Sequence, residues 1–512
     1  YMLKINLKSC SNIKLKVDNL IWVFPKFFSL AAGALAKLLF CKGKVFPIFA
    51  FLMIYFSLTV IRKLHPRNRL KLSFWYGTFF GIGYFGSSLY WITESFFCVG
   101  LNNLAYPAVI LLIVYLSLYF SLTFLFTALF YKTRIELIFL FAIFWICFEY
   151  ARGVMFTGFP WNLISYSSYD ISYFPQIADT VGSYGLSFIF VLLIGFLTYR
   201  KTFLFGILGF ASAIFYGYCK IHYFTDYIHP QGQSFVSVIQ PSISQEDKLN
   251  FKKFRNNIEL QLALSDLGNL YKGKRLIIWP EAAINIPINK KNGILEYISS
   301  HIRYDDIFII SGTDRTSDNE KLYNGLTVIG NKSRTIQTYE KRHLLPFGEF
   351  IPEFLFGLGL KAITNVGIDF SKGTKSRTIN IPGFSKFDAL ICYEIAFPGA
   401  IIDNKDSQWI LNITNDSWFK NSDGPSQHLR SACFRALEEG RPILRCANNG
   451  ISCVIDCNGK IKEKLDTDVV GRIDSKMPQT FRKTIYSKYK EIPIFLIILF
   501  IILGLIIRRN RR

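Results

Sequence analysis

The sequence predicts a polytopic α-helical membrane domain joined to an α/β domain of ordinary globular composition. At 512 residues the chain is too long for one ordinary domain, and 51% of it is hydrophobic, with 50 phenylalanines. The apolar residues crowd into 20–224 and 492–507, whereas 225–490 is long enough to bury its own core. We therefore expect a seven-span domain at 1–224, an extracytoplasmic globular domain at 225–490, and a final transmembrane helix with a basic tail at 491–512.

Seven apolar stretches precede the globular region, and most approach the roughly 20 residues that a helix needs to cross a bilayer. An eighth, Ile492 to Ile507, is shorter but carries no charge, so its flanking Lys490 and Arg508 are expected to extend to the membrane surfaces. The first seven stretches lie near residues 20–40, 45–61, 73–93, 104–130, 135–152, 184–199 and 203–222.

Basic residues alternate between the loops and predict the orientation of the chain. Lys and Arg occur before the first span and in every second loop after it, whereas residues 94–103 and 153–183 contain none. Because positive loops stay in the cytoplasm, both termini are predicted there and residues 225–490 on the far side. This distribution also accounts for much of the net charge of +23. Since no nucleic-acid-binding signature accompanies that charge, we expect no nucleic-acid partner.

Strands that alternate with a helical segment predict an α/β domain after residue 230. Each expected strand is a short run of mostly apolar residues, and one of them follows the turn-like pair Pro382-Gly383. The helical segment is more polar and has a helical period. The strands are expected at Ser234–Ile239, Arg275–Trp279, Asp306–Ser311 and Phe387–Ile391, and the helical segment at Asn250–Leu267.

Three reactive residues accompany these strands. Glu281 and Cys392 each follow the end of an expected strand, and Lys341 lies between them in the sequence. The strand ends could converge on one edge of a sheet. There the carboxylate could accept the thiol proton, while the ammonium could lower the thiol pKa and later face an oxyanion. His343 is the rival base for a Cys–His pair, and the spacing does not decide between His343 and Glu281.

A series of short motifs, taken in order, resembles one family. They are Thr157-Gly-Phe-Pro-Trp161, Trp279-Pro-Glu281, His343-Leu-Leu-Pro-Phe-Gly-Glu349, Cys392-Tyr-Glu394, Asn415-Asp-Ser-Trp418, Gly424-Pro-Ser-Gln-His428, Arg435-Ala-Leu-Glu438 and Asn448-Asn-Gly450. Together with eight expected spans, this order is similar to the membrane-bound branch of the nitrilase superfamily, the bacterial apolipoprotein N-acyltransferases. The resemblance covers nearly the whole chain.

The resemblance implies a nitrilase-like α-β-β-α sandwich with a Glu-Lys-Cys triad. Glu281 would be the general base, and Lys341 would stabilise the oxyanion together with the backbone N–H of Tyr393. Cys392 would carry the acyl group as a thioester. The resemblance also implies supporting or substrate-binding positions around the pocket: Glu349, Tyr393, Glu394 and Trp418.

The implied activity is the last step of lipoprotein maturation. An acyl chain would pass from a membrane phospholipid, through the Cys392 thioester, to the α-amino group of the lipidated N-terminal cysteine of an apolipoprotein. The expected partners are the phospholipid donor, the diacylglyceryl-apolipoprotein acceptor and the bilayer. A thiolate and a carboxylate carry the reaction, so we expect neither a cofactor nor a metal. The protein is expected to be a monomer in the bacterial inner membrane, with its catalytic domain on the periplasmic side.

Two positions depart from the family pattern, and two other functions stay open. Leu249 and Ser426 stand where the family often has Trp, which affects the expected substrate contacts but not the chemistry. A membrane-tethered amidase or nitrilase that hydrolyses a small C–N substrate would share the triad but would need no seven-span platform. A transporter with a degenerate soluble domain would need intramembrane charges, of which Glu149 is the clearest. An intact Glu-Lys-Cys set argues against a degenerate domain.

Overall fold

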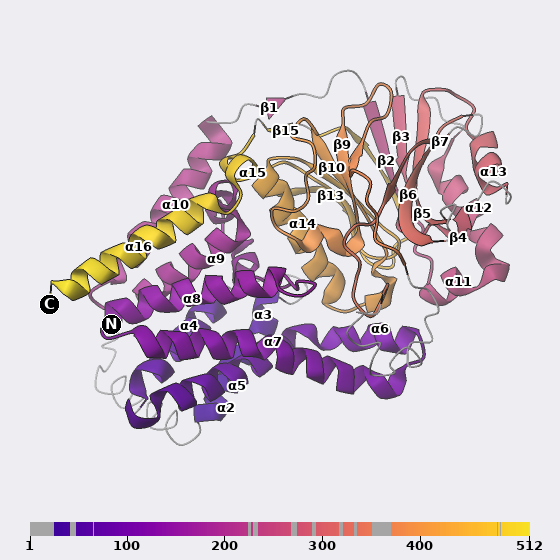
Figure 1. Cartoon of the computed structure of the whole chain (residues 1–512). Coiled ribbons are helices and arrows are strands. Elements are labelled where there is room, and N and C mark those ends of the chain that lie inside the picture. Colours follow the sequence, from indigo (N-terminus) through magenta and orange to yellow (C-terminus); the bar gives the residue numbers. More distant parts are fainter. Residues whose placement is uncertain are drawn as a thin grey trace, which may run out of the picture.

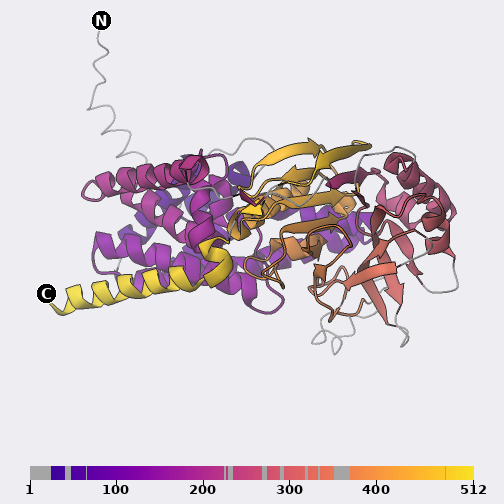
Figure 2. The ribbon, with the colours of Figure 1, turned by 90° about the horizontal axis from the view of Figure 1, so that it is seen from above.

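Apolar runs in the first half of the chain form helices that pack side by side, and the sheets lie at one end of this helical part (Figures 1 and 2). The structure is a computed structural model. It describes residues 25–40, 48–64, 66–223, 227–228, 234–267, 274–288, 293–316, 321–331, 335–350, 370–478, 480–481 and 483–511.

Helices form at all eight expected stretches as far as the described residues reach. Residues 20–24 and 45–47 of these stretches, and the expected domain boundary near residue 225, lie outside the described residues. Five of the described helices, α7 to α10 and α16, are long and apolar enough to cross a membrane. Crossing by the other stretches stays a prediction. The helices are α2 (Pro25–Ala34), α3 (Ala36–Phe40), α4 (Ile48–Lys63), α5 (Arg69–Leu89), α6 (Thr93–Cys98), α7 (Asn102–Phe130), α8 (Arg134–Val154), α9 (Ala178–Leu197), α10 (Phe203–Tyr223) and α16 (Ile492–Asn510).

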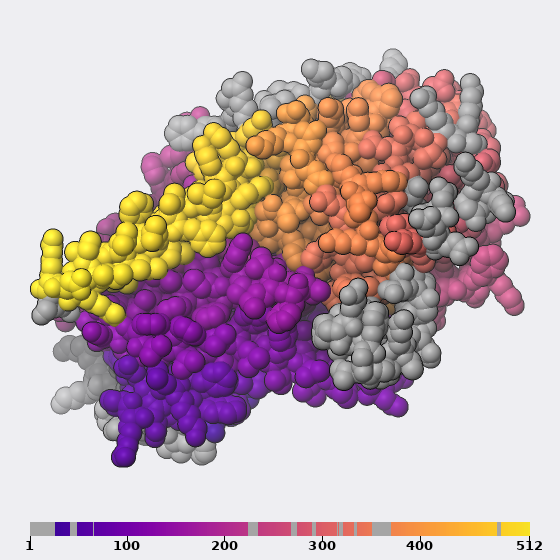
Figure 3. All heavy atoms as spheres, viewed as in Figure 1, coloured from indigo at the N-terminus to yellow at the C-terminus, as the bar shows by residue number. Residues whose placement is uncertain are grey.

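Helix α5 carries small residues because it packs closely against α7. A Cβ atom added at Gly77 would lie 2.5 Å from the backbone oxygen of Phe120, and one at Gly81 would lie 2.6 Å from the Cα of Ser117. The Thr78 and Ser121 hydroxyls meet across the same interface at 2.8 Å. Such small and hydroxyl residues let helices in a membrane approach one another. Helix α16, by contrast, lies along the surface of the helical part (Figure 3).

The α/β domain contains two sheets. The seven-stranded sheet has the order β14-β2-β3-β5-β6-β7, with β4 paired to β5, and the six-stranded sheet has the order β13-β12-β11-β10-β9-β8. The first comprises β2 (Ser234–Gln240), β3 (Lys274–Ile278), β4 (Ile284–Ile288), β5 (Ile307–Thr316), β6 (Leu322–Ile329), β7 (Thr335–Glu340) and β14 (Gly471–Lys476). The second comprises β8 (Thr378–Ile379), β9 (Phe387–Ile391), β10 (Trp409–Thr414), β11 (Ile443–Ala447), β12 (Ser452–Ile455) and β13 (Ile461–Leu465). Strands β1 (Tyr227–Ile228) and β15 (Thr480–Phe481) form a separate pair.

Three buried clusters define the layers of this domain. Side chains of both sheets, such as Val236 and Leu411, form one core between them. Helices α12 (Phe254–Ser265) and α13 (Ile294–Ser300) cover the outer face of the seven-stranded sheet. Helix α14 (Gly424–Glu439) covers the outer face of the other sheet. The α-β-β-α order of the expected sandwich is therefore confirmed, and so are the four expected strands, which correspond to β2, β3, β5 and β9.

Helix α14 also packs against the helices of the first part of the chain, so it is buried on all sides. Ala432 and Ala436 face the sheet, whereas Phe434 and Leu437 belong to the core of the helical part. Gln427 on this helix accepts hydrogen bonds from three side chains and donates to two carbonyls of that part. The donors are Trp161 Nε1 at 2.8 Å, Trp91 Nε1 at 3.2 Å and Asn162 Nδ2 at 3.2 Å, and the acceptors are the oxygens of Ser88 at 3.1 Å and Phe40 at 3.2 Å.

Replacing Gln427 with Leu is expected to loosen this interface. Leucine has a similar size but can neither accept from the two indoles nor donate to the two carbonyls. An unpaired buried polar group costs about 1–3 kcal/mol. The detergent-solubilised variant should therefore unfold several degrees lower in a tryptophan-fluorescence melt, at roughly 2–4 °C per kcal/mol. The neighbouring Ser426→Ala is the control, because the Ser426 hydroxyl bonds only within α14 and its N-terminus. An unchanged Tm in Gln427→Leu would contradict this account.

Candidate active site

Three strand ends position the expected reactive residues. Glu281 follows β3 after Trp279-Pro280, Lys341 directly follows β7, and Cys392 directly follows β9. The sequence allowed these ends to converge on one edge of a sheet, and the structure does not have that arrangement. Strands β3 and β7 belong to the seven-stranded sheet, whereas β9 belongs to the six-stranded sheet. The reactive groups therefore meet across the two packed sheets.

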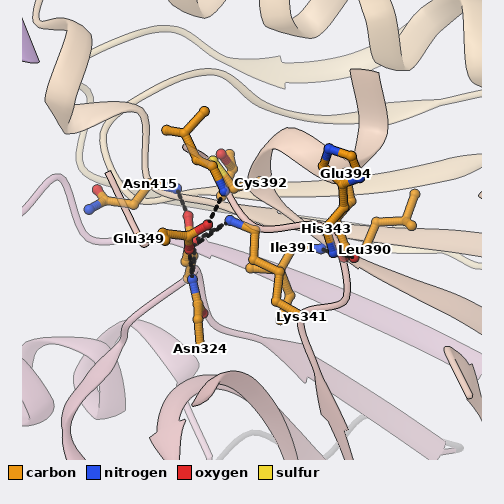
Figure 4. A network of polar contacts seen from close by, with 12 residues as sticks. Asn324, Lys341, His343, Glu349, Leu390, Ile391, Cys392, Glu394 and Asn415 are labelled. Carbon is orange, nitrogen blue, oxygen red and sulfur yellow. Dashed lines mark hydrogen bonds and ion pairs between the residues drawn. The ribbon is translucent and has the colours of Figure 1, made fainter. Parts of the chain in front are cut away.

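Lys341 lies between two carboxylates in a buried cluster. Its Nζ is 2.9 Å from Glu349 Oε1 and 3.6 Å from Glu281 Oε1, and the residue is only 2% exposed. Asn324 on β6 donates through Nδ2 to both carboxylates, at 2.8 Å to Glu281 and 2.7 Å to Glu349. The backbone N–H of Asn415 donates to the other oxygen of Glu281 at 2.8 Å. Figure 4 shows Lys341, Glu349, Asn324 and Asn415 converging beside Cys392.

The backbone at Cys392 is held in a turn that Glu394 organises. Cys392 has φ of +51°, a left-handed conformation that a residue other than glycine adopts only when its surroundings impose it. Glu394 accepts from the N–H of Ile391 at 2.9 Å, the hydroxyl of Tyr339 at 2.8 Å and the N–H of Arg342 at 3.0 Å. These bonds tie the turn after β9 to the turn after β7. The expected supporting residue Glu394 thus acts on the backbone that carries the thiol.

Burial and charge set the protonation states of the cluster. Burial and the Glu281 carboxylate raise the pKa of the Cys392 thiol, and the Lys341 ammonium opposes them. Burial lowers the pKa of Lys341. The Glu349 and Glu281 carboxylates have a larger effect and raise the pKa of Lys341 above its ordinary value. At neutral pH, Lys341 is therefore charged and the thiol is protonated. A nucleophile of this kind needs a base at the moment of attack.

His343, the rival base, packs against aromatic rings. Its ring centroid lies 3.9 Å from that of Phe397 and 6.0 Å from that of Tyr393. Burial lowers the pKa of His343. The charges that act on the Cys392 thiol are those of Glu281, Lys341 and Asp416. This arrangement favours Glu281 as the base.

The remaining expected site residues lie on the side that faces the helical part. The Tyr393 hydroxyl donates to the oxygen of Gly158 at 3.2 Å, in the loop between α8 and α9. Trp418 is half-buried in a short 3-10 helix, and its carbonyl lies 3.9 Å from Cys98 Sγ of α6. Of the two departures from the family pattern, Leu249 is 61% exposed, and Ser426 lines a small depression together with Phe40 and Gln427. The described residues contain no group of His, Cys, Asp or Glu that could hold a metal ion.

Sequence reasoning missed two residues that contact the carboxylate cluster. Asn324 lies within β6, and no local pattern distinguishes it from other strand residues. Lys248 donates through Nζ to the backbone oxygen of Glu281 at 2.8 Å, and burial lowers its pKa to about 8. Asp314 interacts with the same groups, and burial raises its pKa to about 7. A buried lysine in a polar helical segment has no sequence signal, because its partners are distant in the chain.

Two family models match the chain. Residues 32–196 match the model described as the apolipoprotein N-acyltransferase N-terminal domain, and residues 235–482 match carbon-nitrogen hydrolase. The apolipoprotein N-acyltransferase of Rickettsia bellii (strain RML369-C) is 31% identical over 510 residues, covering 94% of this chain and 97% of the relative. The chain belongs to the apolipoprotein N-acyltransferase family.

A second relative supports the assignment to this family. The apolipoprotein N-acyltransferase of Brucella melitensis biotype 1 is 30% identical over 432 residues, which is 81% of each chain. Among solved structures, an amidase from Nesterenkonia sp. is similar to 49% of this chain and 92% of its own, at 16% identity and a TM-score of 0.34. That score is too low to carry an argument. The family match, the two sheets and the apolar helices establish a membrane protein with a nitrilase-superfamily domain.

Charge substitutions in the cluster are expected to move the thiol pKa in opposite directions. Glu281→Gln removes a negative charge that raises the pKa of Cys392, so the pKa should fall. Lys341→Met removes a positive charge that lowers it, so the pKa should rise. Each shift should be about one to two units, as for a charge close to a titrating group. The measurement is the pH dependence of iodoacetamide alkylation at Cys392, followed by peptide mass spectrometry.

His343→Ala is the control for this measurement. Its imidazole is neutral near pH 7 because burial lowers its pKa, so the alkylation midpoint should stay unchanged. A larger shift in His343→Ala than in Glu281→Gln would favour the Cys–His pair instead.

Proposed function

We propose that this chain transfers an acyl chain from a membrane phospholipid, through a thioester at Cys392, to the α-amino group of the lipidated N-terminal cysteine of bacterial apolipoproteins. The observation that carries the proposal is the buried Glu281–Lys341 cluster beside Cys392, next to the apolar helices. The names of the relatives support the reaction and the acceptor. In this proposal Glu281, Lys341 and Cys392 form the catalytic triad.

The first half-reaction loads the enzyme. Glu281 takes the thiol proton while the sulfur of Cys392 attacks the ester carbonyl carbon of the phospholipid. The Lys341 ammonium, with the N–H of Tyr393, faces the oxyanion that develops. When the tetrahedral species collapses, the carbon–oxygen bond to the glycerol breaks. Glu281 returns its proton to that oxygen, and a lysophospholipid leaves.

The second half-reaction discharges the thioester. The neutral α-amino group of the acceptor attacks the thioester carbonyl carbon, and Glu281 takes a proton from the nitrogen. The carbon–sulfur bond breaks, an amide forms, and the proton from Glu281 restores the Cys392 thiol. Lys341 stays charged throughout, because Glu349 neutralises it at 2.9 Å. Asn324 and the N–H of Asn415 keep Glu281 in place.

The position of the site beside the apolar helices supports lipid substrates. Both proposed substrates are anchored in one bilayer, and the sandwich is connected to apolar helices at both ends, by α10 and α16. Within this proposal, residues 1–224 form the membrane domain, 225–490 the periplasmic catalytic domain, and 491–512 the last inner-membrane helix with its cytoplasmic tail. The enzyme acts as a monomer. A small-molecule amidase would have no use for this arrangement.

The covalent intermediate is expected on Cys392 alone. Purified protein incubated with phospholipid and no acceptor should gain one acyl chain, seen by intact-protein mass spectrometry and removed by neutral hydroxylamine. Cys392→Ser should gain at most a trace, because a serine alkoxide is far harder to form than a thiolate. Glu281→Gln should also stay unloaded, since a carboxamide cannot accept the proton.

The discharge step distinguishes an acyltransferase from an amidase. A diacylated lipopeptide should remove the acyl chain quickly, and water should remove it slowly. His343→Ala should load nearly as fast as the wild type, which makes it the matched control. If Cys392→Ser gained the acyl chain to the same extent as the wild type, the thioester mechanism would be wrong. If water removed the acyl chain as fast as the lipopeptide does, the enzyme would be an amidase and not an acyltransferase.

The orientation is tested with single introduced cysteines. Glu463→Cys lies on an exposed position of β13 and Arg67→Cys on the exposed turn between α4 and α5. In spheroplasts, a membrane-impermeant maleimide should label position 463 at once and position 67 only after permeabilisation, measured against the unsubstituted protein. The reverse pattern would place the sandwich in the cytoplasm.

A further inference from the structure

A second polar network adjoins Cys392 and includes residues of β10 and α14. Strand β10 runs parallel to β9 with Ile413 opposite Ile391, so Thr414 stands next to Cys392 at the strand ends. Thr414 is 0% exposed. Its hydroxyl donates to Asp416 Oδ1 at 3.0 Å, and Thr414 lowers the pKa of the neighbouring Cys392 thiol. The mechanism above does not use this hydroxyl.

Asp416 has two further partners that do not depend on Thr414. Arg445 donates to Asp416 Oδ2 at 2.7 Å, and His428 Nδ1 lies 3.0 Å from Oδ1. Burial alone would raise the pKa of Asp416, but Arg445 and His428 lower it to about 2. Asp416 is therefore a fixed anion, and it keeps strong partners when the Thr414 proton turns elsewhere.

His428 contacts the backbone of Cys392 and not its sulfur. Its Nε2 lies 3.1 Å from the Cys392 oxygen, an oxygen that Asn412 Nδ2 also approaches at 3.4 Å. Burial and the Arg445 charge lower the pKa of His428. Within this network, Thr414 is the residue that stands beside Cys392 in the strand register. Asp416, without a donor in between, faces the sulfur as a like charge and raises the thiol pKa.

We propose that Thr414 is a further catalytic residue, whose hydroxyl donates a hydrogen bond to the Cys392 thiolate each time it forms. In the resting enzyme the Thr414 proton points to Asp416. When Glu281 removes the thiol proton, the Thr414 hydroxyl turns its proton to the sulfur. Arg445 and His428 keep their contacts with the Asp416 carboxylate. The Thr414 proton never leaves its oxygen, so charge and atoms balance as before.

The same rotation assists the second half-reaction. The sulfur of Cys392 is then the leaving group, and it carries negative charge until Glu281 returns a proton. Lys341 and Thr414 both lower the pKa of the thiol, the first as an ammonium and the second as a hydroxyl. The inference rests on the proposed function, because it assigns Thr414 to the thioester cycle of Cys392.

The test compares Thr414→Val with Thr414→Ser. Valine keeps the branched shape but loses the hydroxyl, and serine keeps the hydroxyl. The first readout is the pH midpoint of iodoacetamide alkylation at Cys392. The second is the rate of thioester formation with phospholipid, from intact-protein mass spectrometry. A hydrogen bond to a charged group is worth about 1.5–3 kcal/mol, which corresponds to a rate change of roughly 10- to 100-fold.

Thr414→Val should raise the midpoint by about one unit and slow loading at least about tenfold. Thr414→Ser should keep both within about twofold of the wild type. A wild-type midpoint and rate in Thr414→Val would overturn the proposal. Equal losses in both variants would also overturn it, since serine keeps the hydroxyl and a general disturbance of the site would then be the cause. If the valine variant does not fold, Thr414→Ala makes the same comparison.

The two readouts separate this inference from the proposed function. Alkylation reports the hydrogen bond to the thiolate without any lipid. A wild type that never gains an acyl chain would refute the thioester mechanism, even if Thr414→Val shifts the alkylation midpoint. A loaded wild type with an unshifted midpoint in Thr414→Val would refute the role of Thr414 alone.

Discussion

The active-site region depends on one buried cation, Lys341. A buried ammonium is stable only when carboxylates and hydrogen bonds compensate for its lost hydration. Glu349 is the closer partner, at 2.9 Å, and Glu281 lies at 3.6 Å. Because of this difference in distance, we propose different roles for Glu349 and Glu281. In the proposed mechanism, Glu349 neutralises the lysine, and Glu281 can therefore take and return protons without releasing the lysine charge at each step.

Two buried charged residues of α8 hold the loop against which the sandwich packs through Tyr393 and Gln427. Arg152 donates to the oxygens of Phe159 and Trp161, both at 2.7 Å, and Glu149 accepts from the N–H of Ile164 at 2.9 Å. Glu149 was the charge that favoured a transporter. In the structure, it holds the loop that contacts Tyr393, the residue after Cys392. The intramembrane charges thus support the active site.

Local patterns predicted the strands and the position of the thiol, but not the partners that lie far apart in the chain. Phe387–Ile391 forms β9 as expected, because a mostly apolar run of 5 residues after a turn has the length of a strand and is too short for a typical helix. The pattern could not show that β9 and β3 belong to different sheets, since strand order is set by packing between distant segments. Asn324 and Thr414 were missed for the same reason: each is an ordinary strand residue until another strand brings a reactive group beside it.

The raised pKa of the Cys392 thiol gives a reason for the crowded polar surroundings. A thiol that stays protonated at rest is protected from oxidation and stray acylation, but its thiolate must be stabilised whenever the sulfur attacks or leaves. Asp416 cannot supply that stabilisation, because it is an anion. In the proposed mechanism the stabilisation comes from the Lys341 ammonium and the Thr414 hydroxyl. A buried site that excludes water also strengthens these interactions, since they act in a medium of low dielectric constant.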